Sequence, residues 1–155
     1  MMPNWGYSIK ELDPEKSAIA SGRDLNISYK AACEICNFIR GMKLDEAIEY
    51  LEKVVKKDKP IPYTRFTGKI AHHRGIQGRA VVKYPVKASK EIIKVLKNVK
   101  ANAEYKGLDI SKLKLVHIAA MKGPILKRYT ERAFGRSTPH NIQLVHIEVA
   151  VLEEE

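Results

Sequence analysis

Two segments of the chain concentrate lysine and arginine, the residue types that bind anions most readily. Residues 56–83 hold eight basic residues against one acid, and residues 122–140 hold five against one. Arginine binds a phosphate through two parallel hydrogen bonds, and lysine supplies a compact point charge. The whole chain carries a formal net charge of +10, so the remainder is nearly neutral and the anion-binding chemistry is localised. The candidate residues are Arg65, Lys69, Arg74, Arg79 and Lys83 in the first segment and Lys122, Lys127, Arg128, Arg132 and Arg136 in the second.

Clustered charge of one sign favours a polyanionic partner. Scattered lysines are usually a solvated surface, but clustered ones repel one another unless a polyanion neutralises them. Release of condensed counterions from a phosphate backbone would then drive binding. An anionic membrane is the rival partner, yet neither segment has an apolar stripe at helical spacing that could enter a lipid interface. The sequence therefore favours nucleic acid.

Metal-ligating residue types are present in a weak pattern. Cys33 and Cys36 have C-x-x-C spacing, and His72 and His73 could complete a zinc site. The cysteines lie within a predicted helix and lack a second ligand pair at the usual spacing. We interpret them as small core residues and expect no metal and no other cofactor.

Catalytic motifs are equally weak. His117 and His146 fall on predicted strands and could face each other, but a catalytic pair needs a nucleophile or carboxylate nearby. Two glycines within residues 74–79 match neither the G-x-G-x-x-G fingerprint nor a P-loop. The sequence therefore does not predict an enzyme.

Three aromatic residues, Tyr63, Phe66 and Tyr84, lie in or beside the first basic segment. Such rings can stack on unpaired bases, but aromatic residues in basic segments equally often pin a loop to the domain. The sequence leaves both roles open.

The size and composition fit one globular domain spanning residues 1–155, with 45% hydrophobic and 30% charged residues. No apolar run approaches the roughly 20 residues of a membrane span, and the first residues do not resemble a signal peptide. Two cysteines are too few for a disulfide framework. A cytoplasmic location is expected.

Apolar residues recur at helical spacing in three places. Ser28 is a good N-cap for the first helix, and Gly41 should end it. Pro85 fits the first turn of the third helix, and Gly107 should follow its end. The periodicity predicts helices over residues 29–40, 43–57 and about 85–106.

The period changes to two in residues 113–121 and 142–151, which predicts two antiparallel strands. A third strand is expected near residues 16–25. The intervening residues 123–140 are too many for a structureless loop in a compact domain. If the strands continue as a ribbon, it projects about 30 Å. An isolated ribbon is marginal in water, so a partner should order it fully.

The expected fold class is therefore α+β. Three helices pack on a small antiparallel three-stranded sheet, and a long, protruding, basic β-hairpin extends from it. The hairpin spans about residues 113–151 with its tip at about 124–140, and the basic insertion spans about 56–83.

Several short motifs together resemble a known family. They include NAEYKGLD at 102–109, KGPILKR at 122–128 and RAFGR at 132–136, with further matches at 28–41 and 45–47. At this spacing the chain is similar to the large-subunit ribosomal protein L twenty-two family over nearly all of residues 16–152. The insertion at 56–83 resembles the archaeal and eukaryotic type, called L seventeen in eukaryotes.

The resemblance implies a structural constituent of the large ribosomal subunit. Its body would lie on the subunit surface, and its hairpin would run inward along ribosomal RNA to line the peptide exit tunnel. The implied partners are ribosomal RNA, neighbouring ribosomal proteins and the nascent chain, and no catalytic residue is implied. The implied tunnel tip comprises Arg132, Ala133, Phe134, Gly135 and Arg136.

Two other functional classes remain as alternatives. A nucleic-acid-binding regulator could use the same charges outside the ribosome, and sedimentation apart from large subunits would identify it. An enzyme acting on RNA would need a carboxylate pair, metal cluster or nucleophile motif, and none is evident.

Overall fold

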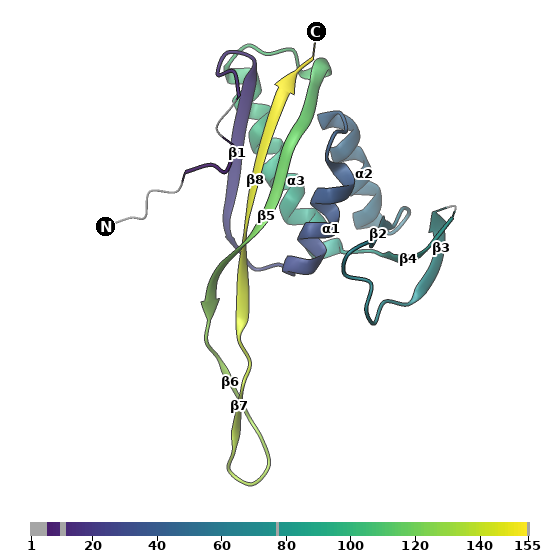
Figure 1. Cartoon of the computed structure of the whole chain (residues 1–155), viewed down its shortest axis with the longest axis vertical. Helices are drawn as coiled ribbons and strands as arrows, with labels where there is room; N and C mark the ends of the chain where they lie inside the picture. Colours follow the sequence, from purple (N-terminus) through teal and green to yellow (C-terminus); the bar gives the residue numbers. More distant parts are fainter. Residues whose placement is uncertain (1–5, 10–11, 77, 155) are drawn as a thin grey trace.

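The computed structural model describes residues 6–9, 12–76 and 78–154, with the backbone alone at residues 74, 75, 79 and 80 (Figure 1). In chain order its elements are β1 (Ser17–Leu25), α1 (Tyr29–Ile39), α2 (Leu44–Lys56), β2 (Ile61–Pro62), β3 (His72–Ile76), β4 (Arg79–Lys83), α3 (Val86–Tyr105), a 3-10 turn (Ile110–Lys112), β5 (Leu113–Leu126), β6 (Tyr129–Glu131), β7 (Ser137–Pro139) and β8 (Ile142–Glu153).

The main sheet has three antiparallel strands in the order β1, β8, β5. Val151 of β8 pairs with Ala18 on one side and Leu115 on the other, which places the last strand in the middle. Three helices with antiparallel strands confirm the predicted α+β class.

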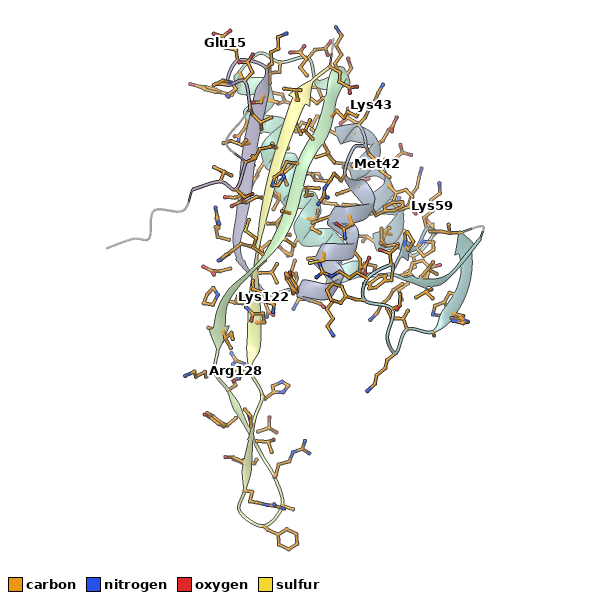
Figure 2. All side chains as sticks on the ribbon, viewed as in Figure 1. Glu15, Met42, Lys43, Lys59, Lys122 and Arg128 are labelled. Carbon is orange, nitrogen blue, oxygen red and sulfur yellow. The ribbon has the colours of Figure 1, made fainter. Side chains whose placement is uncertain are left out.

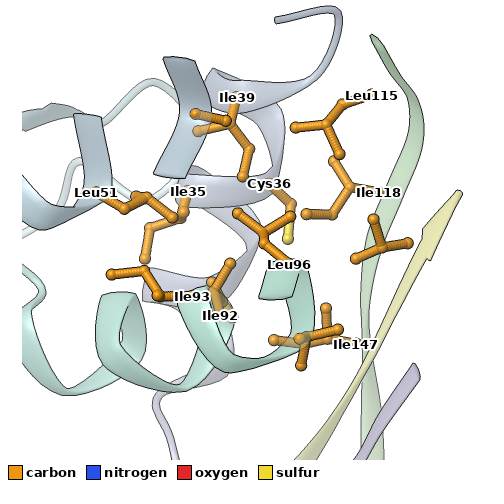
Figure 3. Close-up of a cluster of buried hydrophobic side chains, with 14 of the residues drawn as sticks. Ile35, Cys36, Ile39, Leu51, Ile92, Ile93, Leu96, Leu115, Ile118 and Ile147 are labelled. Atoms are coloured by element: carbon orange, nitrogen blue, oxygen red, sulfur yellow. The ribbon is translucent and has the colours of Figure 1, made fainter. Parts of the chain in front are cut away.

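One face of this sheet forms the core with the helices (Figure 3). Alternate residues of β8, including Val145, Ile147 and Val149, point to this face because strand side chains have a period of two. They belong to one buried cluster with Leu96 of α3 and Ile35 of α1, both fully buried. The helical stripes predicted from the sequence therefore supply the core.

The opposite face of the sheet carries buried polar residues. Glu148 of β8 is only 2% exposed and accepts hydrogen bonds from the backbone N–H and hydroxyl of Ser8, at 3.0 and 2.8 Å. Its other oxygen lies 3.3 Å from the Arg23 guanidinium. The segment before β1 is thereby held against this face, and the carboxylate keeps partners despite its burial.

The helix ends agree with the predicted bounds to within two residues, but their capping differs in part. Gly41 has a φ of +82° and donates its N–H to Leu115 at 2.8 Å, so it ends α1 as expected. Ser28 occupies the N-cap position, yet its side chain makes no capping hydrogen bond. Pro85 was predicted to lie in the first turn of α3, but it is the N-cap residue, one position before the helix begins. Gly107, with a φ of +77°, follows the end of α3 as predicted.

A second small sheet, in the order β2, β4, β3, forms inside the basic insertion and was not predicted. Ile61 of β2 pairs with Lys83 of β4, and His72 of β3 pairs with Val81 of β4. Ile61 and Val82 are fully buried, so they help to anchor this segment to the body.

Candidate nucleic-acid interface

β5 and β8 continue as a two-stranded ribbon beyond the main sheet (Figure 1). The pairing of β1 with β8 ends at Val145, whereas β5 remains paired with β8 as far as Ile142. β6 and β7 prolong the ribbon, and the Arg132 N–H donates to the Arg136 carbonyl at 2.8 Å across its end. Between these two arginines, Phe134 and Gly135 both have positive φ, which makes the tight reversal.

The cations of this ribbon face solvent. Figure 2 shows Lys122 where the ribbon leaves the sheet and Arg128 farther along it. Within residues 6–9, 12–76 and 78–154, no acid forms an ion pair with any of the ribbon cations. The Arg132 Nε donates to the Thr138 hydroxyl at 3.3 Å, which leaves most of its guanidinium available. The exposed basic residues are Lys122, Lys127, Arg128, Arg132 and Arg136.

A tight contact shapes the root of the ribbon. A Cβ on Gly123 would lie 2.9 Å from Cε1 of the His146 ring, closer than side chains tolerate. Gln143 donates to the Gly123 carbonyl at 2.6 Å, and the register of β5 with β8 shifts between Lys122 and Ile125. Glycine is therefore needed at position 123 because the backbone there lies against the His146 side chain of the neighbouring strand. The position falls at a bulge that bends the ribbon.

The loop that opens the basic insertion is held by Glu34 of α1. Its carboxylate accepts backbone N–H groups of Thr64, Arg65 and Phe66 at 3.1, 2.8 and 2.7 Å. Burial alone would raise the pKa of Glu34, but these hydrogen bonds outweigh it and leave the pKa below its usual value. Sequence reasoning missed this residue, although it is the single acid among the residues of α1.

The candidate residues of the insertion occupy different settings. Arg65 is exposed with its guanidinium carbon 5.4 Å from the centre of the Phe66 ring. Lys69 and Lys83 are exposed, and Lys69 has a φ of +61°. Arg74 and Arg79 were also predicted to bind RNA, but their side chains lie outside the described part of the structure.

The structure separates the roles of the aromatic residues. Tyr63 is 6% exposed, so it pins the segment to the body, and burial raises its pKa to about 12. Phe66 is half-buried and meets the Tyr29 ring edge-on, with 6.4 Å between centroids. Phe66 thus anchors the loop while keeping part of its ring accessible. Tyr84 is also half-buried.

The sulfur and histidine candidates fit structural roles. Cys33 and Cys36 are free and buried as predicted, and burial raises the pKa of Cys36 to about 12. Among the described residues, no cluster of three or more His, Cys, Asp or Glu could hold a metal ion. His117 and His146 do not face each other in the sheet, because they pair with Ala150 and Met121 respectively.

The described helices include none with the length and apolar character required to cross a bilayer.

The comparisons with known proteins point in one direction. The family model described as ribosomal protein L22p/L17e matches residues 20–152. The chain is 53% identical to the large ribosomal subunit protein uL22 of Ignicoccus hospitalis, covering 99% of this chain and 100% of that one. It is 49% identical to uL22 of Hyperthermus butylicus, with 99% and 100% coverage, and 50% identical to that of Methanocaldococcus jannaschii, with 99% and 97%. The chain belongs to the ribosomal protein L22p/L17e family, whose members are structural proteins and not enzymes.

Proposed function

We propose that this chain is a structural constituent of the large ribosomal subunit that binds ribosomal RNA. The observation that carries the proposal is the part of the ribbon beyond the main sheet, residues 122–142, with five exposed cations and one acid, Glu131. The relatives named large ribosomal subunit protein support the setting. In this proposal residues 1–155 act as a single domain in the cytoplasm, within the ribosome.

The ribbon works as a long protruding basic β-hairpin that penetrates between RNA helices. Two paired strands without a third neighbour are marginally stable in water, and surrounding phosphates would stabilise them by removing the repulsion between cations. Backbone contacts would position the protein, and the shape of the RNA would supply recognition.

The same proposal assigns the individual contacts. Arg132 and Arg136 flank the reversal, where a guanidinium can pair with a phosphate or stack on an unpaired base. The other RNA-contacting residues are Arg65, Lys69, Arg74, Arg79, Lys83, Lys122, Lys127 and Arg128.

The tip of the hairpin, residues 132–136, lines the peptide exit tunnel in this proposal, and the helical body stays on the subunit surface beside neighbouring proteins. Phe134 supports the tip assignment because its side chain lies at the reversal of the ribbon and is 94% exposed, so a passing chain can reach it. A nascent chain passing the tip would meet this ring.

Two experiments test the proposal. Native protein should sediment with large subunits, and recovery only in small free complexes would instead identify a regulator acting outside the ribosome. A cleaving reagent attached to Phe134→Cys should cut ribosomal RNA at the tunnel wall, and the burial of both native cysteines restricts attachment to position 134. Cuts confined to the outer surface of the subunit would overturn the tunnel assignment.

A further inference from the structure

Two adjoining hollows lie where the body meets the root of the hairpin. One has a volume of about 370 Å³ and the other about 520 Å³. Figure 1 shows the start of α1 at the level where β5 and β8 leave the main sheet. We call the two hollows together the trough. The residues that line both of them are Ser28, Lys30, Phe66 and Lys87.

The trough is lined by cations without any acid. The first hollow adds Lys69 and Lys83 to the shared lysines, and the second adds Lys122. Neither lining contains Asp or Glu, and no ion pair in the described part of the chain involves these five lysines. Five like charges around one depression repel one another, so an anion bound there would be stabilised.

The starts of two helices add to this positive field. The first residues of α1 and α3, including Ala31 and Val86, line the first hollow. Neither helix has an acidic residue in its first turn, and neither N-cap side chain caps the free N–H groups. In contrast, α2 places Asp45 and Glu46 in its first turn. The positive ends of α1 and α3 therefore remain available to an anion.

The trough also contains a π-surface and an unused hydroxyl. Phe66 forms part of both walls, with Lys30 Nζ 5.8 Å from its ring centre. Tyr63 lines the first hollow, and its buried hydroxyl has no hydrogen-bond partner among the described residues. Asn141 and Gln143 of the returning arm line the second hollow with amide groups that can donate and accept.

Charge, aromatic surface and amide groups in one depression fit a nucleotide that is not base-paired. We propose that the trough binds a single-stranded stretch of RNA, with a phosphate among the lysines and an unpaired base against Phe66. This inference rests on the proposed RNA-binding function and deepens it, because it assigns a ligand class to a region that includes the proposed RNA contacts Lys69, Lys83 and Lys122. A paired duplex could use the lysines but could not offer a free base face to the ring.

The role of the trough lysines is tested by replacing two of them with alanine and comparing the result with the same replacement of two exposed lysines elsewhere. Lys30→Ala with Lys87→Ala removes two trough cations, and Lys90→Ala with Lys97→Ala removes two exposed cations outside both linings. The probe is a labelled single-stranded RNA of about six nucleotides, within the site sizes of single-strand binders. The trough pair should weaken binding about tenfold and lower the salt slope by about 1.4, and the control pair should change neither. Equal losses in both pairs would overturn the trough assignment.

The aromatic contact is tested by Phe66→Leu, which keeps an apolar side chain but removes the ring. It should weaken single-strand binding about tenfold and leave binding of a fully paired duplex unchanged. Circular dichroism establishes that the variant is folded, and ring resonances of Phe66 in the unaltered protein should shift with the single strand alone. Base stacking on Phe66 would be overturned if Phe66→Leu weakened binding of the single strand and the duplex equally. It would also be overturned if the single strand left the Phe66 ring resonances unshifted.

The outcomes separate the trough from the proposed function. If the trough variants bind normally while hairpin variants lose RNA, the trough proposal fails and the proposed function stands. If the intact protein binds no RNA, both fail. A hexaglutamate peptide that displaces the single strand at equal concentration would instead make the trough a site for acidic protein segments.

Discussion

The carboxylate of Glu34 accepts the backbone N–H of Phe66 at 2.7 Å, which ties the first helix to the loop that opens the basic insertion. The acid is 1% exposed, so its charge is retained only because several donors surround it. One buried acid thereby positions a wall of the cationic trough.

Glu34→Gln should lower the free energy of unfolding by about 2 kcal/mol, because the amide turns an N–H₂ group toward backbone donors that need an acceptor. Urea denaturation measures the loss. Glu49→Gln is the control, since Glu49 is 65% exposed and its ion pair with Lys53 lies on the helix surface. That control should leave the free energy of unfolding nearly unchanged, because solvent screens an exposed ion pair, and equal losses in the two variants would contradict the special role of Glu34.

Acid should erase the advantage that Glu34 confers. Its folded-state pKa lies below the ordinary 4.5, so its contribution is fully present above that value and is lost as pH falls through the folded pKa. The difference in unfolding free energy between the unaltered protein and Glu34→Gln should therefore be constant near neutral pH and shrink in acid. Urea titrations across this window check the prediction, and a difference independent of pH contradicts it.

Gly123→Ala should destabilise the root of the hairpin by about 1–3 kcal/mol, because the new methyl group would overlap the buried His146 ring. His146→Ala should relieve that overlap, so a double-mutant cycle should give a favourable coupling between the two changes. Gly68→Ala is the control, because nothing lies within 4 Å of a Cβ at that position. An additive cycle would show that the two side chains do not compete for space.

Arg132→Ala with Arg136→Ala should leave the fold intact and weaken binding to large-subunit ribosomal RNA. Both side chains are exposed and have no ion pair within the described residues. The slope of log affinity against log salt should fall by about 1.4 to 1.8 if each arginine contacts one phosphate. Filter binding across a salt series measures this slope against the Lys90 and Lys97 control pair. An unchanged slope would exclude these arginines from phosphate contact.

The cysteines should resist alkylation in the folded protein. Burial raises the pKa of Cys36 to about 12, so almost no thiolate is present near neutral pH, and Cys33 is also buried. Mass spectrometry after iodoacetamide treatment should find both thiols unmodified until urea unfolds the chain. Rapid modification of Cys36 in the folded state would show that helix α1 opens far more readily than its packing implies.

The sequence by itself determined the elements with a regular apolar period. Helices α1, α2 and α3 and strands β5 and β8 follow from it, because each presents a continuous apolar face that must be buried. The clustering of Arg128, Arg132 and Arg136 was equally visible, since net charge is a sum over residues and needs no coordinates.

The tertiary structure decided the features that depend on contacts between distant residues. The strands β2, β3 and β4 are two to five residues long and too short for a period to emerge. Glu34 meets a loop 30 to 32 residues away, and Gly123 requires its lack of a side chain because of a ring on another strand. The trough likewise needs lysines from separate elements to converge. Folding sets these proximities through non-local packing, which local pattern does not encode.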